Sequence, residues 1–133
     1  MKKDKKLTSL LLIGVLTFSL AGVTAMAATY SGYKLPARQG NNYTGTHSKT
    51  TTDNYIQNKV TDIENADTVT FWAANSSNKQ ISGDYDQKLN SSSKIKFNVS
   101  GYDRKNKDIK MGMENANWTA ISTAFVAGKV DFR

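Results

Sequence analysis

The chain has no cysteine and only one histidine among its 133 residues. Without cysteine it can form no disulfide bond, no thiol nucleophile and no thiolate metal site, so packing and hydrogen bonds alone must hold the fold. One histidine, His47, is too few for the usual zinc ligand sets. These absences exclude the cysteine-dependent enzymes and the common zinc centres.

Motifs for nucleophilic catalysis are also missing. His47 lies in a polar Thr-His-Ser stretch, and no Gly-x-Ser-x-Gly elbow is present to frame a Ser/His/Asp set. We therefore interpret His47 as a solvated strand residue. The sequence predicts a protein that is not an enzyme and that needs neither a cofactor nor a metal.

The N-terminus has the three-part order of a secretory signal peptide. The cationic start Met1–Lys6 precedes the apolar run Leu7–Val23, and Thr24–Ala27 ends in a small-x-small pattern. We predict a cleaved signal helix over residues 1–27, a secreted protein and a Gram-positive source. An uncleaved membrane anchor is the alternative, but the apolar run is at the short limit for spanning a bilayer.

Residues 28–133 are long enough for one domain with a modest core. They carry fourteen Lys and Arg against ten Asp and Glu, a net charge of +4. Such mild basicity favours approach to an anionic envelope, either a wall polymer or a membrane surface. It lacks the concentrated charge of a nucleic-acid binder, and export argues against that role as well.

Alternation of apolar and polar residues dominates this part of the chain. Lys94–Ser100 turns Ile95, Phe97 and Val99 to one side, and Ile109–Glu114 repeats the pattern. Thr68–Ala73 does the same, with Phe71 facing inward and Trp72 facing the opposite side. These runs predict half-buried antiparallel strands.

Two further runs are less regular. Tyr55–Ile63 places Ile56 and Val60 on one side. In Ile121–Phe132 the apolar phase of Ile121 and Phe125 changes after Phe125, which predicts a bulge or bend near Ala127–Gly128. Thr44–Asp53 has little to bury and is either an edge strand or a long loop. With polar turns between the runs and no amphipathic helix, we predict an all-β antiparallel sandwich of about seven or eight strands.

Aromatic and cationic residues in or near turns are the candidate binding residues. Exposed aromatic rings can stack on sugars or lie at a membrane interface, although Trp118 has the alternative of folding back to cap the sandwich. The segment Tyr102–Lys107 is a candidate patch for anionic polymers or lipid headgroups. The full candidate set is Tyr43, Trp72, Tyr102, Arg104, Lys105, Lys107 and Trp118.

Acidic residues offer a weaker alternative. Asp84 and Asp86 would share one face of a strand, and paired carboxylates can hydrolyse glycosidic bonds. The same pair, or Glu114 with Asn115 and Asn117, supplies oxygen donors for calcium, but neither set has an established loop spacing. A solvated junction between a turn and a strand also explains the acidic pair.

Three short segments carry a resemblance: Thr50–Thr52, Thr70–Asn75 and Met113–Asn117. Through them the chain resembles small exported proteins of Gram-positive bacteria that consist of a signal peptide and one β domain. It is similar in architecture, more loosely, to β-sandwich bacteriocins of the lactococcin type, which are also small, exported and free of cysteine. The resemblance implies a secreted β-sandwich and assigns no residue a role.

From these observations we expect a secreted, non-enzymatic β-sandwich protein that acts at the bacterial cell envelope, with a bacteriocin-like effector as the more specific form. The alternative is a passive surface or matrix protein that binds glycans or partner proteins, for example through an edge strand. A cell-wall hydrolase using Asp84 and Asp86 is the weaker alternative.

Overall fold

The computed structural model describes residues 27–133, which contain nine strands and no helix. The predicted signal peptide lies outside the described residues, except for Ala27, which is the first residue of β1. The strands are β1 (Ala27–Leu35), β2 (Asn42–Tyr43), β3 (His47–Ser48), β4 (Tyr55–Glu64), β5 (Val69–Asn75), β6 (Tyr85–Gln87), β7 (Ser92–Lys96), β8 (Asp108–Asn115) and β9 (Ala124–Asp131).

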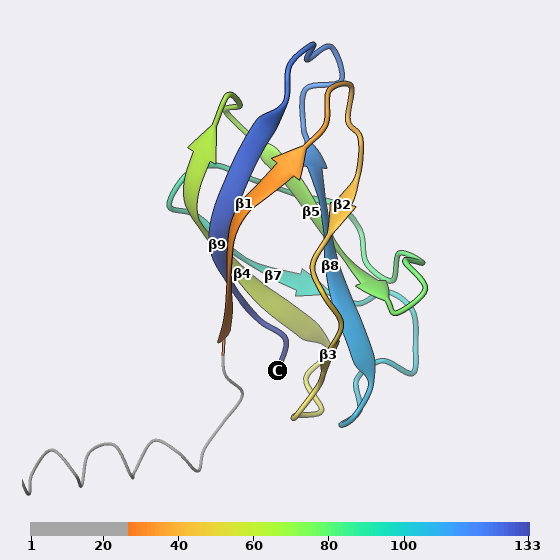
Figure 1. Ribbon diagram of the computed structural model, residues 1–133. Helices are drawn as coiled ribbons and strands as arrows, with labels where there is room; N and C mark the ends of the chain where they lie inside the picture. The colour runs from red at the N-terminus through yellow and green to blue at the C-terminus, as the bar shows by residue number, and fades with distance from the viewer. Residues whose placement is uncertain (1–26) are drawn as a thin grey trace, which may run out of the picture.

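The strands form two antiparallel sheets. The first sheet has the order β1-β9-β4-β7, and the second has the order β2-β8-β5-β6, with β3 also paired to β8. Figure 1 shows β1, β9 and β4 on one side of the molecule and β2, β8 and β5 on the other. The predicted all-β antiparallel sandwich is confirmed. Since the two-residue strands β2 and β3 pair with successive parts of β8, they share one edge position.

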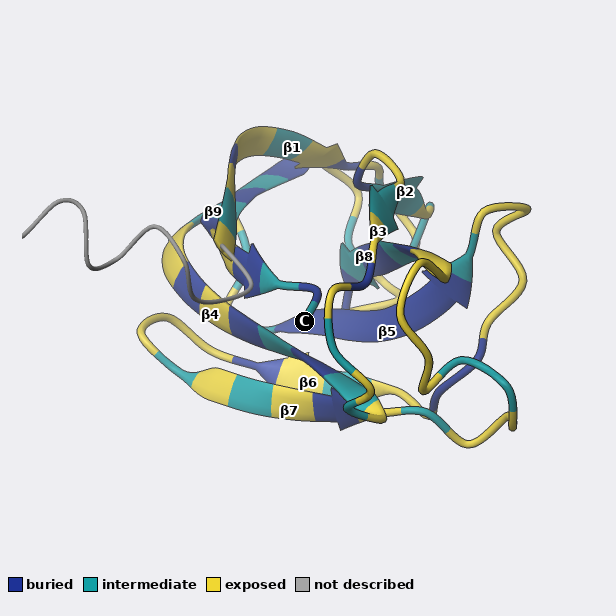
Figure 2. Ribbon diagram, turned by 90° about the horizontal axis from the view of Figure 1, so that it is seen from below, coloured by how far each residue is buried: buried dark blue, intermediate teal, exposed yellow. Residues whose placement is uncertain are grey.

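The core lies between the two sheets and uses the alternation that the sequence predicts. Figure 2 shows β5 buried along almost its whole length, on both of its faces. The predicted inward faces of β4, β5 and β8 are confirmed. Their core side chains are Ile56, Val60, Val69, Phe71, Ala73, Ile109, Met111 and Met113.

Strand β9 differs from the prediction. Its buried residues alternate in a single phase from Ala124 to Phe132, so the change of phase predicted near Ala127–Gly128 is wrong. Phe125 faces outward, and Ile121 precedes the strand and is exposed. The irregularities lie in the two neighbouring strands instead, between Tyr30 and Tyr33 in β1 and between Val60 and Asp62 in β4.

Gly128 lies at the level of both bulges. It pairs with Tyr30 on one side and Val60 on the other, immediately before each bulge. A Cβ atom at Gly128 would lie 2.3 Å from the carbonyl oxygen of Lys59 and 2.5 Å from Oη of Tyr30. Glycine therefore allows the Tyr30 ring to lie directly across β9.

The Tyr30 hydroxyl begins a buried polar chain between the sheets. It donates to Oδ1 of Asn58 at 2.8 Å, and Nδ2 of Asn58 donates to Oε1 of Gln87 at 3.0 Å. Nε2 of Gln87 then donates to the carbonyl oxygen of Ser91 at 3.0 Å. Burial raises the pKa of Tyr30, so its hydroxyl stays a donor. Satisfied polar groups of this kind fix how the two sheets are placed.

Strand β7 is shorter than predicted. It ends at Lys96, and Phe97 forms only an isolated bridge with Ser82. Ile95 is buried as predicted, Phe97 is partly buried, and Val99 is exposed in the loop that follows. The predicted inward phase thus holds for Ile95 and is lost by Val99.

Candidate functional site

The predicted binding residues occupy three separate places. Tyr43 and Trp72 lie on the outer side of the second sheet, Tyr102–Lys107 lies in the loop before β8, and Trp118 lies in the loop after β8. At about 3.3 Å per residue, the eight residues of β8 separate these two loops by about 26 Å. The residues therefore cannot form one site.

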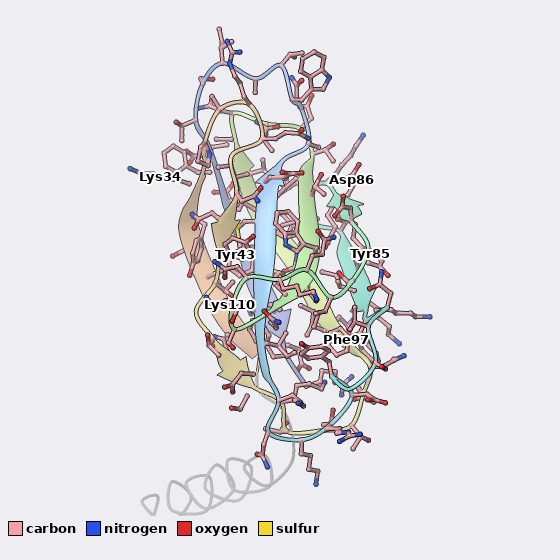
Figure 3. All side chains as sticks on the ribbon, turned by 90° about the vertical axis from the view of Figure 1, so that its right-hand side faces the viewer. Lys34, Tyr43, Tyr85, Asp86, Phe97 and Lys110 are labelled. Atoms are coloured by element: carbon pink, nitrogen blue, oxygen red, sulfur yellow. The ribbon has the colours of Figure 1, made fainter. Side chains whose placement is uncertain are left out.

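Trp72 is buried and is not a surface binding residue. Only 4% of it is exposed, although it faces away from Phe71 as predicted. Its indole lies against Gly112, where an added Cβ would come within 2.2 Å of the ring. Tyr43 packs edge-on against it, with ring centroids 5.9 Å apart at 87°. Figure 3 faces this side of the molecule and shows Tyr43 beside the middle of β8.

Acidic side chains lie on the same outer face. Thr70 is paired with Glu114 on one side and Asp86 on the other, and its hydroxyl donates to Asp86 at 2.6 Å. Burial, together with the charges of Asp84 and Asp86, raises the pKa of Glu114. Nε2 of Gln80 donates to Asp84 at 2.8 Å.

Within residues 27–133, no group of three or more acidic, histidine or cysteine side chains is placed to hold a metal ion. Asp84 and Asp86 are both exposed, and their hydrogen bonds to Gln80 and Thr70 are those of a polar sheet surface. A cell-wall hydrolase would therefore have to use a solvent-exposed pair of carboxylates.

The cationic segment before β8 is an open loop. Nζ of Lys107 lies 5.7 Å from the centre of the Tyr102 ring, and Oη of Tyr102 accepts from Asn75 at 3.2 Å. Arg104 and Lys105 are exposed. The four predicted residues are thus neighbours. Tyr102 is held through its hydroxyl, and Lys107 is held through its backbone carbonyl, which accepts from the backbone nitrogen of Lys49 at 2.9 Å.

A buried lysine that the sequence pattern does not predict lies at the same end. Lys49 is 1% exposed, and its Nζ donates to the carbonyl oxygens of Arg133 at 3.0 Å and Phe132 at 3.4 Å. Burial lowers its pKa. His47 stacks on Phe132 with ring centroids 4.3 Å apart, so it is packed rather than solvated as expected. These contacts attach β3 to the end of β9. They give both Lys49 and His47 a structural role.

The loop after β8 presents two large apolar side chains to solvent. Trp118 is 71% exposed and Ile121 is 84% exposed, so Trp118 does not fold back over the sandwich. A tight turn holds this geometry, because Oδ1 of Asn117 accepts from the backbone nitrogen of Thr119 at 3.0 Å. The backbone nitrogen of Arg38 also donates to the carbonyl oxygen of Ala120 at 3.0 Å, which braces the loop against the β1–β2 connection.

A polar hollow of about 620 Å³ lies beside this loop. We call the hollow, Trp118 and Ile121 together the Trp118 end, and treat it as the candidate site. Amide, hydroxyl and carboxylate groups dominate the lining. The β4–β5 connection, the last residue of β8 and the β8–β9 connection supply it: Asn65, Ala66, Asp67, Thr68, Asn115, Ala116, Asn117 and Ala120. An exposed indole next to such groups has the chemistry of a sugar-binding surface.

Comparison with known proteins does not assign the chain to a family. No family model matches the chain, and no curated protein or solved structure is significantly similar to it. The part of the chain that the structure describes holds no helix long and apolar enough to cross a membrane. Any function must therefore be argued from the surface itself.

Proposed function

We propose that this protein is a secreted, non-enzymatic β-sandwich that acts at the bacterial cell envelope through the Trp118 end. The observation that carries the proposal is the exposure of Trp118 and Ile121 on a braced turn. Two large apolar side chains gain nothing from facing water, whereas an indole has a flat apolar face and a polar N–H suited to sugars and interfaces.

Two kinds of envelope protein fit this surface. A bacteriocin-like effector would use it to engage a target cell, whereas a passive surface protein would use it to hold a glycan. The polar hollow beside Trp118 favours glycan binding, since its lining offers hydrogen-bond donors and acceptors rather than apolar contact. A wall polysaccharide is thus the envelope component that the Trp118 end fits best.

The test uses protein collected from the culture medium of a host that expresses the full chain. Appearance in the medium, with an N-terminus at residue 28, would support the predicted export. Binding is then measured by co-sedimentation with purified cell walls for the wild type, for Trp118→Ala and for Leu89→Ala. Leu89 is a matched control because it is an exposed large apolar residue outside the Trp118 end.

We expect Trp118→Ala to release most of the protein from the walls and Leu89→Ala to leave binding unchanged. Equal binding of all three proteins would refute the role of the Trp118 end. A second assay distinguishes the bacteriocin-like effector from the passive surface protein. It measures growth and dye entry in several Gram-positive strains that are exposed to the wild type. Killing that Trp118→Ala abolishes indicates the effector, and wall binding without killing indicates the passive glycan-binding protein.

A further inference from the structure

Four lysines lie together on the outer face of the first sheet, although they are scattered in the sequence. Lys59 in β4 pairs directly with Lys129 in β9. Lys94 in β7 pairs with Gln57, the residue two before Lys59, and Lys96 pairs with Tyr55. Residues two apart on a strand share a face, and neighbouring strands are about 4.8 Å apart. We call Lys59, Lys94, Lys96 and Lys129 the lysine face.

No acidic side chain in the described part of the chain forms an ion pair with the lysine face. All four lysines are exposed, and none forms an ion pair with another described residue. Asp131 lies on the same face, two residues from Lys129, and its carboxylate is bound to Arg133, through a hydrogen bond from the backbone nitrogen at 2.9 Å and an ion pair with Nε at 3.7 Å. Asp62 lies beyond the bulge in β4, where it pairs with Ala127.

The pairing of Lys59 with Lys129 has a cost to the fold. Like charges directly opposite each other on adjacent antiparallel strands destabilise the pair. A sheet surface selected only for stability would place an acid opposite one of them. The arrangement is therefore better explained by an anionic partner that lies across the face.

The composition of the face indicates what kind of anion binds. Within residues 27–133 the exposed large apolar side chains are Leu89, Val99, Trp118 and Ile121, and each lies in a connection rather than on a strand of the first sheet. The lysine face thus has no exposed large aliphatic or indole side chain to enter a bilayer. A soluble charged chain needs no such anchor, because charge attraction and counterion release supply its binding free energy.

We propose that the lysine face binds a linear phosphate-containing polymer, which lies across strands β9, β4 and β7. This proposal rests on the proposed function only in placing the protein at the cell envelope. The lysine face is a different surface from the Trp118 end. Lys94 is already positioned for this role, since its Nζ lies 5.0 Å from the centre of the Tyr55 ring on the same face. Outward-facing Gln57, between Lys94 and Asp131 in the register, adds a neutral hydrogen-bonding group to the face.

The experiment measures binding of the full chain's secreted product to inorganic polyphosphate by titration calorimetry at low and high salt. The test variant is Lys59→Gln with Lys129→Gln, and the matched control is Lys79→Gln with Lys110→Gln, which lie in the β5–β6 connection and on β8 of the second sheet. Both lose two positive charges, but only the first alters the lysine face. Each lysine near an anionic partner strengthens binding about fivefold, so we expect about 25-fold weaker binding for the test variant and little change for the control.

Thermal melting of the test variant distinguishes lost binding from unfolding. The test variant should melt no lower than the wild type because an opposed like-charge pair has been removed, so lost binding is not unfolding. Equal weakening in both variants would show that net charge alone acts and would overturn the proposal. So would an absence of polyphosphate binding at low salt, or binding to anionic vesicles only.

The Trp118→Ala variant distinguishes this proposal from the proposed function. It should keep its affinity for polyphosphate even where it no longer binds purified walls, since Trp118 lies outside the lysine face. Failure of polyphosphate binding with Trp118-dependent wall binding intact would refute the lysine face alone. The reverse result would refute the role of the Trp118 end alone.

Discussion

Replacing Gly112 with alanine tests the most closely packed contact on the second sheet. The added Cβ would lie 2.2 Å from the Trp72 indole, which is held from above by Tyr43. Glycine-to-alanine changes in a strand interior ordinarily gain about 0.5–1 kcal/mol, so a net loss would isolate the steric clash. Overpacking of this kind costs about 1–3 kcal/mol, and loss of the Tyr43 edge contact adds about 0.5–1.5 kcal/mol. After the ordinary gain is subtracted, we expect a net destabilisation of about 0.5–4 kcal/mol.

The assay is equilibrium unfolding in urea, followed by far-ultraviolet circular dichroism. Gly83→Ala is the control, because nothing lies within 4 Å of a Cβ built at Gly83. Fluorescence in a Trp118→Phe background then reports on Trp72 alone, whose emission should shift to longer wavelength as the indole is displaced. The packing argument is refuted if Gly112→Ala and Gly83→Ala unfold at the same urea concentration and the Trp72 emission stays unchanged.

Three further predictions concern the interior and one acidic side chain. Tyr30→Phe should cost about 1–3 kcal/mol in urea unfolding by removing the buried donor to Asn58, and an unchanged midpoint would contradict this. Gly128→Ala should lower the melting temperature while Gly45→Ala, with open space at its Cβ, leaves it unaltered. Because the pKa of Glu114 is raised in the fold, the folded state retains a proton that the unfolded chain releases, so stability falls as pH rises above about 4.5. Glu114→Gln should flatten that decline in thermal melts, and an identical slope would contradict the assignment.

Local alternation predicts much of the sandwich correctly. The inward faces of β5 and β8 follow from a period of two, which depends only on the residues of each strand. Phe71 and Met111 are therefore found in the core as expected. The same rule places Trp72 on the opposite face from Phe71, which is also correct.

The burial of residues at the candidate sites depends on contacts that the pattern of neighbouring residues does not predict. Trp72 was expected at the surface, but Tyr43, from a distant strand, packs against it. Lys49 lies in a Thr-rich stretch with no sign of burial, and it is buried because Phe132 and Arg133 lie beside it in the fold. The exposure of Trp118 depends in turn on how Asn117 closes its turn.

The sequence by itself determined the all-β class, the inward faces of the main strands and the presence of candidate aromatic and cationic residues. Each of these depends on neighbours within a few positions of the chain. The tertiary structure decided that β1 and β4 bulge opposite Gly128 and that Lys59 and Lys129 lie side by side. Strand register joins residues far apart in the chain, and it is set by which strands pair and pack together, so no single strand's sequence contains it.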